Sequence, residues 1–353
     1  MYDIAIIGLG PAGSTLARFL DSSLKVVAID RKRLDGSQGG FQKPCGGLLS
    51  TGAQKVLAET GLNLPSSILV DPQIFAVKTM DLISGLTRCY QRCYLNMDRH
   101  KFDLWLASLI SPSVEVIDRA DCRQVVNHGS HYEIVLSQGG HQRTITARRV
   151  VGADGSNSIL RRTFIPTPIR RYICIQEYYA GQPHEPYGCF FDERLTDCYG
   201  WVNNKSGHQI LGLALPFDYP RARYETAKER LGSFGYQFCG TPSQVEAALV
   251  SRPTSLRQIT AGRHNMFLIG EAAGLVSPSS LEGISYALGS ALRLSRVLNH
   301  DPAEPLKRYS RSLWPLRLKI ISRMAKNPFM YQPRLRRMVM LSGLTALKMQ
   351  SGG

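Results

Sequence analysis

The stretch DIAIIGLGPAGSTLARFLDSSLKVVAID, residues 3–30, decides the fold of this chain. It reads as a short buried strand, a turn with glycines at 8, 10 and 13, a helix, and a second strand that ends in Asp30. In this spacing Gly8 permits a tight turn, Gly10 lets the backbone approach a pyrophosphate, and Gly13 lets the helix pack closely on the strand. Glycines alone are a weak signal, but the whole series predicts a dinucleotide-binding unit.

The ends of this unit suggest how the ligand is held. The helix opens at Pro11 and Ala12, where free N–H groups and the helix dipole favour an anion such as pyrophosphate. Asp30 follows the second strand, and its carboxylate can accept hydrogen bonds from the hydroxyls of a ribose.

Two later segments indicate which dinucleotide binds. RRVVGADGSNS (148–158) is a predicted strand that runs into Asp154, and HNMFLIGEAAGLVSPSSLEGISYALGSA (264–291) is a strand, a turn with Glu271, and a helix that opens near Gly283. In open α/β sheets, ligands bind at the carboxyl ends of the strands. Three such ends, far apart in sequence, predict one long ligand across the sheet. FAD fits this prediction and NAD alone does not.

Length and composition bound the class of protein. The chain has 353 residues, of which 43% are hydrophobic, so we expect two interlocked domains. Its eight cysteines form neither a CxxC pair nor a zinc-type cluster, which is typical of reduced cytoplasmic thiols, and no metal site is expected. The first residues lack a signal-peptide pattern, and no apolar run approaches the length of a transmembrane helix. We therefore expect a cytoplasmic protein.

The predicted fold class is α/β, with a Rossmann-like FAD-binding domain interleaved with a β-sheet substrate domain and followed by C-terminal helices. Short alternating runs, such as RRYICIQEYYA (170–180), predict the second sheet. The predicted ranges are 1–70, 96–165 and 256–300 for the FAD-binding domain, 71–95 and 166–255 for the substrate domain, and 301–353 for the basic helical region.

The substrate domain is rich in aromatic residues, which could line one face of its sheet or simply form its core. An aromatic sheet that faces a flavin suits an apolar or aromatic substrate. GSQGG (36–40) is expected to form a loop, either over the cofactor or elsewhere on the surface. The aromatic set comprises Tyr172, Tyr178, Tyr179, Phe190, Phe191, Tyr199 and Trp201.

The net charge of +16 is concentrated at the C-terminal end. From Pro305 to Gly353 there are eleven Lys or Arg and no Asp or Glu, so the rest carries only about +5 (16 − 11). The cations alternate with Leu, Ile, Met, Trp and Phe, a pattern typical of a helix on an anionic membrane surface. A helical pair docked on the domain with a solvated basic face is the alternative. No nucleic-acid motif accompanies the charge, so no nucleic-acid partner is expected.

The motifs above, with PCGG (44–47) and MDRHKFD (97–103), occur in an order that resembles the geranylgeranyl reductase family of FAD-dependent oxidoreductases. This family belongs to the aromatic-hydroxylase-type group of FAD proteins. The likeness covers nearly the whole chain and is greatest to a small bacterial branch linked with colicin M resistance. These motifs are specific for FAD and for the fold, and much less so for the substrate.

The resemblance implies roles along the cofactor. The glycine turn would hold the pyrophosphate, and Asp30 with Arg31 the adenosine end. Arg99 would reach the phosphate or ribityl region, Glu271 the ribityl hydroxyls, and the helix N-terminus at Gly283 the flavin pyrimidine, where it stabilises negative charge. The implied cofactor-binding set comprises Gly8, Gly10, Pro11, Ala12, Gly13, Asp30, Arg31, Cys45, Gly46, Gly47, Arg99, Asp154, Glu271, Gly274, Gly283 and Ile284.

Two motifs depart from the family pattern. The common GDA is GEA here, so Glu271 replaces an aspartate and its longer side chain shifts the reach of the acceptor. The substrate-side motif Y.W.FP appears as YGWVNN, which keeps Tyr199 and Trp201 but has Asn203 and Asn204 in place of Phe-Pro. The second departure weakens the transfer of a prenyl-chain substrate.

In the family, the PCGG segment lies beside the isoalloxazine ring. Gly46 and Gly47 would let the backbone approach a flat ring, and Cys45 would be a wall residue at the reactive face. Cys45, Tyr199 and Trp201 are therefore the candidate catalytic residues, all substrate-facing. Whether Cys45 is a wall or transfers a proton stays open, because no partner histidine is evident and only a helix N-terminus could lower its pKa.

Three functions are consistent with these motifs. The first is a reductase that passes a hydride from flavin N5 to a carbon–carbon double bond of an apolar, isoprenoid-like lipid. The second is an aromatic or polyketide monooxygenase, and the third a membrane-surface flavoprotein with a structural or sensing FAD. The sequence has no second GxGxxG motif, so the expected electron donor is a transiently bound NAD(P)H, a redox protein or a quinol.

Overall fold

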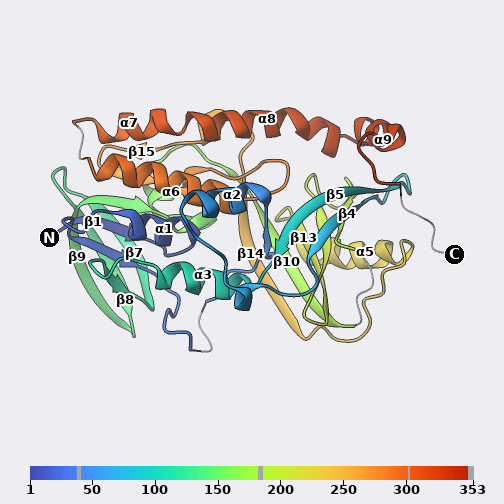
Figure 1. Ribbon diagram of the computed structural model, residues 1–353, viewed down its shortest axis with the longest axis horizontal. Coiled ribbons are helices and arrows are strands. Elements are labelled where there is room, and N and C mark those ends of the chain that lie inside the picture. Colours follow the sequence, from blue (N-terminus) through green and yellow to red (C-terminus); the bar gives the residue numbers. More distant parts are fainter. Residues whose placement is uncertain (38–40, 182–185, 301–302, 349–353) are drawn as a thin grey trace.

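The computed structural model describes residues 1–37, 41–181, 186–300 and 303–348. In these ranges the chain forms two eight-stranded sheets, with helices packed on them and a row of C-terminal helices along one edge (Figure 1). This arrangement confirms the predicted α/β fold class with a second sheet and C-terminal helices. The predicted loop GSQGG at 36–40 falls partly on residues 38–40, which lie outside the described residues.

The first sheet has the strand order β15-β16-β9-β1-β2-β6, and β8 and β7 extend it from the first half of β9. Strands β16, β9, β1, β2 and β6 are parallel to their neighbours in this order, so their carboxyl ends meet at one edge. Its strands are β1 (Tyr2–Ile7), β2 (Val26–Ile29), β6 (Glu115–Ile117), β7 (Ala120–Asn127), β8 (Tyr132–Gln138), β9 (His141–Gly152), β15 (Gly262–Arg263) and β16 (Met266–Leu268).

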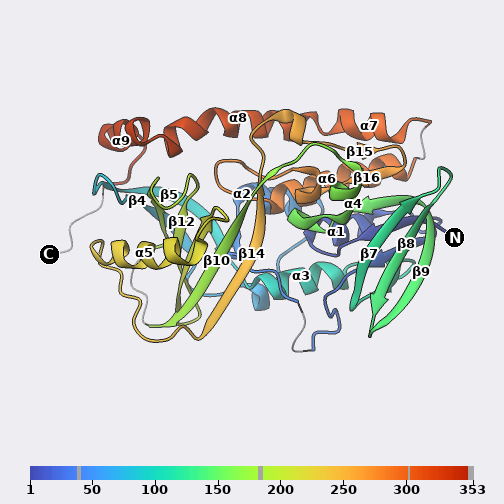
Figure 2. The same cartoon turned by 180° about the vertical axis from the view of Figure 1, so that it is seen from behind.

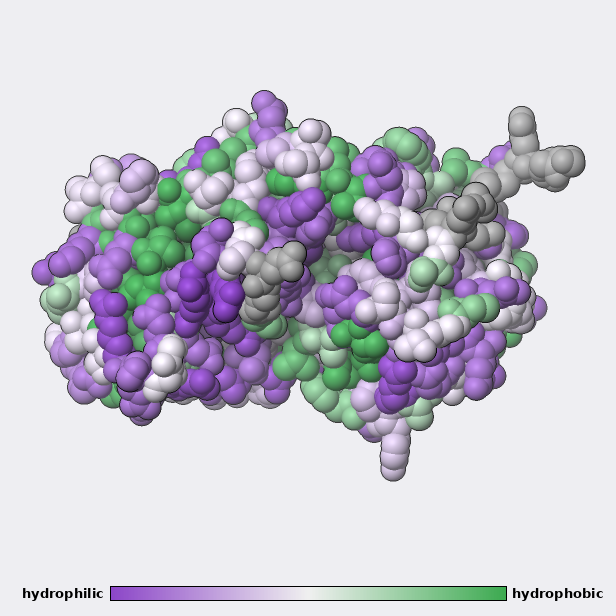
Figure 3. Space-filling model, turned by 90° about the horizontal axis from the view of Figure 1, so that it is seen from below, coloured by the Kyte–Doolittle hydropathy of each residue, from purple (hydrophilic) through white to green (hydrophobic). Residues whose placement is uncertain are grey.

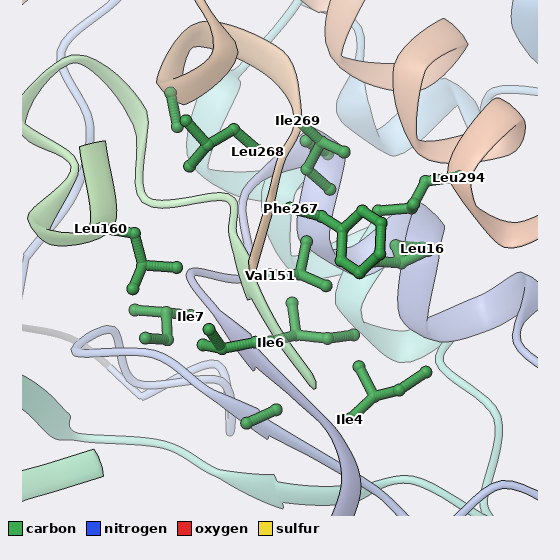
Figure 4. Close-up of a cluster of buried hydrophobic side chains, with 14 of the residues drawn as sticks. Ile4, Ile6, Ile7, Leu16, Val151, Leu160, Phe267, Leu268, Ile269 and Leu294 are labelled. Atoms are coloured by element: carbon green, nitrogen blue, oxygen red, sulfur yellow. The ribbon is translucent and has the colours of Figure 1, made fainter. Parts of the chain in front are cut away.

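Helices cover this sheet through one continuous apolar core. Phe267 of β16 lies beside Leu16 of α1, Leu294 of α6 and Val151 of β9 (Figure 4). Burying each such side chain contributes about 1.5–3 kcal/mol relative to exposure, so this core fixes the parallel strands and their ends. The helices of this half are α1 (Pro11–Phe19), α2 (Thr51–Glu59), α3 (Arg99–Ser108), α4 (Ile159–Phe164) and α6 (Ile284–Leu298).

The second sheet has the order β14-β10-β13-β12-β11-β4-β5-β3 and is antiparallel except where β11 pairs with β4. Segments from both predicted parts of the substrate domain therefore share one sheet. Its strands are β3 (Leu48–Leu49), β4 (Ile74–Asp81), β5 (Thr87–Asn96), β10 (Arg170–Ala180), β11 (Gly188–Phe191), β12 (Gly200–Lys205), β13 (His208–Leu215) and β14 (Gln244–Arg252).

One face of this sheet carries helix α5 (Pro220–Gly232), and the two faces divide the aromatic residues. Phe190 packs in the α5-side core, and Lys228 of α5 lies over the Tyr179 ring. Of the two alternatives for the seven aromatic residues, one shared face does not hold for these two, because successive side chains of a strand point to opposite faces, and Phe190 instead belongs to the core.

The basic C-terminal region forms helices α7 (Pro305–Ser312), α8 (Trp314–Tyr331) and α9 (Pro333–Ser342), which follow one another along one edge of both halves (Figures 1 and 2). Tyr309 of α7 anchors this row by donating to the carbonyl of Leu268, 3.0 Å away. Arg336 of α9 is buried and pairs with Asp81 of β4. The opposite side of the molecule is mainly hydrophilic, with hydrophobic residues in separate patches (Figure 3).

Among the described residues, no helix has both the length and the apolar character needed to cross a bilayer.

Candidate functional site

The glycine turn lies between the end of β1 and the start of α1, and its three glycines have different constraints. Gly8 has φ +98°, and a Cβ there would approach Ala153 and Asp154 to within 2.7–2.8 Å. A Cβ at Gly13 would overlap the carbonyl oxygen of Gly8. Gly10 has an ordinary φ of −78°, and a Cβ there would meet no described atom within 4 Å. The fold itself thus requires Gly8 and Gly13 but leaves open space beside Gly10.

Asp30 lies at the carboxyl end of β2 and fixes this turn. Its carboxylate accepts hydrogen bonds from the backbone N–H of Leu9 and, at 2.7 Å, from that of Lys32. Asp30 thereby ties the second strand to the turn, at the position expected for ribose binding. The guanidinium of Arg31 lies 3.5 Å from the centre of the Phe41 ring, on an exposed part of the surface.

The ends of β9 and β16 bring two acids together. One oxygen of Asp154 accepts from the N–H of Ile159 at 2.7 Å, and the other is buried without a hydrogen-bond partner among the described residues. Burial raises the pKa of Asp154. Glu271 bonds the ammonium of Lys43 at 2.8 Å and the N–H of Ser251 at 2.7 Å. The longer side chain at 271 is therefore engaged by the protein on both oxygens.

Two further glycines of the predicted set lie in this region. Gly274 has φ +77° and ends the turn that carries Glu271, and a Cβ there would lie 2.6 Å from Gln258 O. Gly283 is the N-cap of α6, which begins at Ile284. The carboxylate of Glu282 accepts from the N–H and the hydroxyl of Ser285, both at 2.7 Å. A carboxylate of the chain thus already lies at the helix end expected to favour an anion.

The PCGG segment packs against alternate residues of β12. Asn203 donates to the carbonyl of Gly46 at 3.1 Å, and a Cβ at Gly46 would lie 3.6 Å from Trp201 Nε1. Gly47 has φ +65°, and a Cβ there would overlap the ammonium of Lys205. The indole N–H of Trp201 is buried without a partner among the described residues. The structure therefore brings together PCGG and the YGWVNN strand, and Asn203 holds them in contact.

The charges around Cys45 lower the pKa of its thiol. Burial alone would raise its pKa, but the Arg99 guanidinium, the Gly47 N–H at 3.4 Å from Sγ and the Lys205 ammonium together hold the pKa of Cys45 below its ordinary value. Lys205 donates to the carbonyl of Met97 at 2.8 Å, and burial lowers its pKa to about 8. A thiol and an ammonium whose pKa values are both lowered thus lie beside the same glycines.

Arg99 opens helix α3, as its motif predicts, and a buried carboxylate fixes its guanidinium. Asp103 accepts from Arg99 Nε at 2.8 Å and from Lys32 Nζ at 2.7 Å. Burial raises the pKa of Asp103, but the two cations outweigh it and lower the pKa to about 2. This network holds the Arg99 charge beside Cys45, whereas its expected contact with the phosphate or ribityl region stays a prediction.

Four aromatic side chains, Trp201, Tyr199, Phe191 and Tyr331, form a cluster that begins beside Gly46, and we call it the aromatic wall. The Tyr199 ring lies 5.8 Å from Trp201 and 6.2 Å from Phe191, and Tyr331 of α8 lies 5.7 Å from Phe191. The hydroxyls of Tyr199 and Tyr331 donate to the carbonyls of Ser280 and Ser279. Burial raises the pKa of both tyrosines well above its ordinary value, so both are neutral.

Sequence reasoning missed three residues of this region. Lys205 continues the alternation of Tyr199, Trp201 and Asn203 along β12, so the period of two could have found it. Lys43 and Tyr331 carry no comparable signal, because each meets its partners only through contacts between distant segments. The site thus extends to the C-terminal helices, which its motifs did not predict.

Comparisons with known proteins agree with this fold. Proteins named CbrA from Escherichia coli O6:H1 and Shigella sonnei are 45% identical over 345 residues, which cover 97% of this chain and 94% and 97% of theirs. A geranylgeranyl bacteriochlorophyll reductase-like protein from Thermoplasma acidophilum has a similar structure, with a TM-score of 0.78, 18% identity, and coverage of 96% of this chain and 90% of that one. PqsL, a probable FAD-dependent monooxygenase from Pseudomonas aeruginosa, has a TM-score of 0.70 at 18% identity, with coverage of 97% and 99%. No family model matches the sequence.

Proposed function

This chain belongs to the family of the CbrA proteins, and from that premise we propose that it is an FAD-dependent oxidoreductase that reduces carbon–carbon double bonds of an apolar substrate. One observation carries the proposal. Cys45 lies between two cations, Arg99 and Lys205, beside the neutral aromatic wall that begins at Trp201. A proton donor beside an apolar wall is what such a reduction asks of the protein.

FAD is the cofactor, and the described residues fit it. The open space beside Gly10 at the start of α1 suits a pyrophosphate, because the fold gives no other reason for a glycine there. Buried polar atoms without partners among the described residues, Asp154 Oδ1 and Trp201 Nε1, remain for ligand groups. The residues that would hold FAD are those of the predicted cofactor-binding set. In it, the glycine turn, Asp30 and Arg31 would hold the adenosine half, and Cys45 to Gly47 the flavin half.

FAD, when bound and reduced, supplies the hydride for such a reaction. A double bond takes up one hydride and one proton to become a single bond, so the chain has to supply the proton. We assign that proton to Cys45 Sγ. Arg99 and Lys205 bring the pKa of the thiol down from its ordinary value, which makes it a better acid at neutral pH. Bulk water returns the proton, and the electrons come from NAD(P)H that binds transiently, a redox protein or a quinol.

The substrate is apolar, of the isoprenoid lipid class. The wall of Tyr199, Trp201, Phe191 and Tyr331 offers rings, while the tyrosine hydroxyls are used on backbone carbonyls. Rings of this kind suit an apolar or aromatic substrate, although Phe191 and Trp201 are already buried and the guanidiniums of Arg336 and Arg252 lie over the Phe191 and Tyr331 rings. Tyr199 and Trp201 therefore face the substrate, with Cys45 at its reacting end.

The enzyme works in the cytoplasm, at the inner face of the membrane, where residues 305–353 supply eleven cations and no acid. An apolar substrate would be found at that surface.

An aromatic or polyketide monooxygenase is the second candidate. The polar side chain of Asn203, in place of the family's Phe-Pro, lies beside Gly46 and favours it. A flavoprotein whose FAD is structural or sensing is the third, and an inability to turn over with any reductant would favour it.

One experiment separates these candidates. The purified yellow protein is photoreduced without oxygen and mixed rapidly with aerated buffer, with and without an unsaturated isoprenoid. Slow reoxidation without a transient species, together with fast oxygen-free reoxidation by the isoprenoid, supports the reductase. A transient species between the reduced and oxidised spectra supports the monooxygenase. Cys45→Ala should slow only the isoprenoid reaction, and the exposed Cys93→Ala is the matched control.

A further inference from the structure

Helix α8 has two chemically different faces. Its inner face contributes Leu316 and Ile320 to the core of the first sheet. Its outer face exposes large apolar side chains, such as Trp314 (51% exposed) and Leu318 (59%), and α9 continues it with Met338 (56%). We define the outer face by six exposed residues, Trp314, Leu318, Ile321, Phe329, Met338 and Leu341.

Cations accompany this outer face. Lys326 precedes Phe329 by three positions, and Arg334 and Arg337 precede Met338; all three cations are exposed. Arg323 is half-buried and, at about 100° per residue, lies on the opposite side of α8 from Trp314. These four cations form no salt bridge with any other residue in the described ranges. Because Pro305 to Gly353 has no Asp or Glu, the outer face is apolar and positive without an acidic neighbour of its own segment.

Buried contacts on the inner side hold the row of helices in place, so a small rotation cannot bury the outer face. Arg336 is 4% exposed and pairs with Asp81 at 3.1 Å and Glu193 at 3.1 Å. Tyr331 donates to Ser279 O at 2.6 Å at the end of α8. With 18 residues, α8 is about 27 Å long at 1.5 Å per residue, and it lies along the edge of the molecule with α7 and α9 (Figures 1 and 2).

We propose that the outer face of α8 and α9 docks on an anionic lipid bilayer, with the helix axes parallel to the surface. Apolar side chains would enter the boundary between headgroups and acyl chains, and the flanking cations would meet the anionic headgroups. A nucleic acid would use the cations but not Trp314 or Phe329, and therefore fits this face less well. This inference names the surface for the membrane contact of the proposed function and rests on it.

Docking by this face places the aromatic wall near the lipid. Tyr331 ends α8, and its ring lies 5.7 Å from Phe191 in the same cluster as Tyr199. The helix that enters the bilayer on its outer side thus contacts the proposed substrate wall on its inner side.

The test is co-sedimentation of the full chain with vesicles of phosphatidylcholine, alone or mixed with phosphatidylglycerol. Wild-type protein should bind the mixed vesicles, and salt should weaken binding because it screens the cations. The pair Leu318→Ser with Phe329→Ser should weaken binding about tenfold or more, since both side chains lose their burial in lipid. The pair Lys326→Gln with Arg337→Gln should weaken binding to mixed vesicles only.

Matched controls carry the same changes elsewhere. Phe75→Ser with Val245→Ser removes exposed apolar residues, and Arg123→Gln with Arg148→Gln removes exposed cations; neither pair should change binding. Flavin content is measured for every variant and should equal that of the wild type. A wild-type protein that contains no flavin would contradict the proposed function but would not contradict the docking face.

Two results would overturn the docking proposal. One is vesicle binding by the wild type that the outer-face variants leave unchanged. The other is a dimer of the wild type in vesicle-free buffer that Leu318→Ser with Phe329→Ser dissociates, which would assign the face to a second copy of this chain.

Discussion

The two ends of the proposed flavin site are built in different ways. At the glycine turn, Gly8 and Gly13 are required by contacts within one short stretch and its neighbouring strand, whereas Gly10 has open space beside it. At the PCGG segment, Gly47 has φ +65°, and a Cβ there would overlap the backbone oxygen of Met97 and the ammonium of Lys205, both from distant parts of the chain. A glycine can thus be needed for its own turn, for a ligand, or for contact with a distant segment, and only the contacts distinguish these cases.

This difference has a consequence for mutations. Changes at the first end should separate folding from cofactor binding, because different glycines serve each. Changes at the second end should couple stability to reactivity, because Lys205 is half-buried beside Cys45 and affects both.

The largest effect is expected for Gly13→Ala. Its Cβ would overlap the carbonyl oxygen of Gly8, which is backbone and cannot move aside cheaply. We expect a loss of about 3 kcal/mol or more in the free energy of unfolding, at the upper end of overpacking costs. Denaturant unfolding of the flavin-free protein measures it. Unchanged stability would mean that the turn does not have this geometry.

Gly10→Ala is the matched change in the same turn. Because its Cβ meets no described atom within 4 Å, the free energy of unfolding of the flavin-free protein should stay within about 0.5 kcal/mol of the wild type. Flavin affinity should fall about tenfold or more, or ~1.4 kcal/mol, because the Cβ would occupy the place of the pyrophosphate. Titration of the flavin-free protein with FAD gives the affinity. Full affinity with an intact fold would contradict the assigned role of Gly10.

Lys205→Met should stabilise the flavin-free protein near pH 7. Burial lowers the pKa of Lys205 from 10.5 to about 8, so the folded state disfavours the charged form. Below about pH 8 the wild type bears this cost in full, and between about 8 and 10.5 its stability recovers as the ammonium deprotonates. After allowance for the lost bond to Met97 O, the variant should gain about 2 kcal/mol at pH 7.

Unfolding at pH 7 and at pH 10 tests this sign. The advantage of Lys205→Met should shrink at the higher pH, while the exposed Lys55→Met, the control, should differ little from the wild type at either pH. A variant that is less stable than the wild type at pH 7 would show that Lys205 is held by a favourable charge interaction instead.

The smallest effect concerns the reactivity of Cys45. Arg99 and Lys205 hold its pKa down against burial, so removal of the Lys205 charge should raise that pKa. The pH midpoint of Cys45 alkylation by iodoacetamide, followed by peptide mass spectrometry, should be higher in Lys205→Met than in the wild type. Alkylation of the exposed Cys93 and Cys239 is the internal control. An unchanged midpoint would mean that the charge of Lys205 does not affect the pKa of Cys45.

The sequence was most informative where a motif is local. The strand, glycine turn and helix of residues 3–19 are set by neighbouring residues, and the second strand with Asp30 follows at the expected distance. The YGWVNN motif named Tyr199 and Trp201 together, and their rings lie 5.8 Å apart. The alternation of side chains along a strand shows that adjacent Tyr178 and Tyr179 cannot share a face, a distinction that the aromatic count overlooked.

Contacts between distant segments were beyond such reasoning. Lys43 meets Glu271 across 228 positions, and Tyr331 reaches the aromatic wall from a helix whose composition suggested only a surface. Charge pairs of this kind depend on how two sheets and the C-terminal helices pack. Cys45 and Arg99 were therefore named from their motifs, but that Arg99 and Lys205 both act on the Cys45 thiol could not be predicted.

The most direct test of the account is a single turnover without oxygen. The photoreduced holoenzyme is mixed with an unsaturated isoprenoid, the flavin spectrum is followed, and the product is analysed by mass spectrometry. The account predicts that the flavin reoxidises and that the product gains two hydrogens for each flavin, with slower reoxidation in Cys45→Ala than in Cys93→Ala. A flavin that stays reduced with every isoprenoid tested, yet reoxidises in air through a transient species, would contradict it.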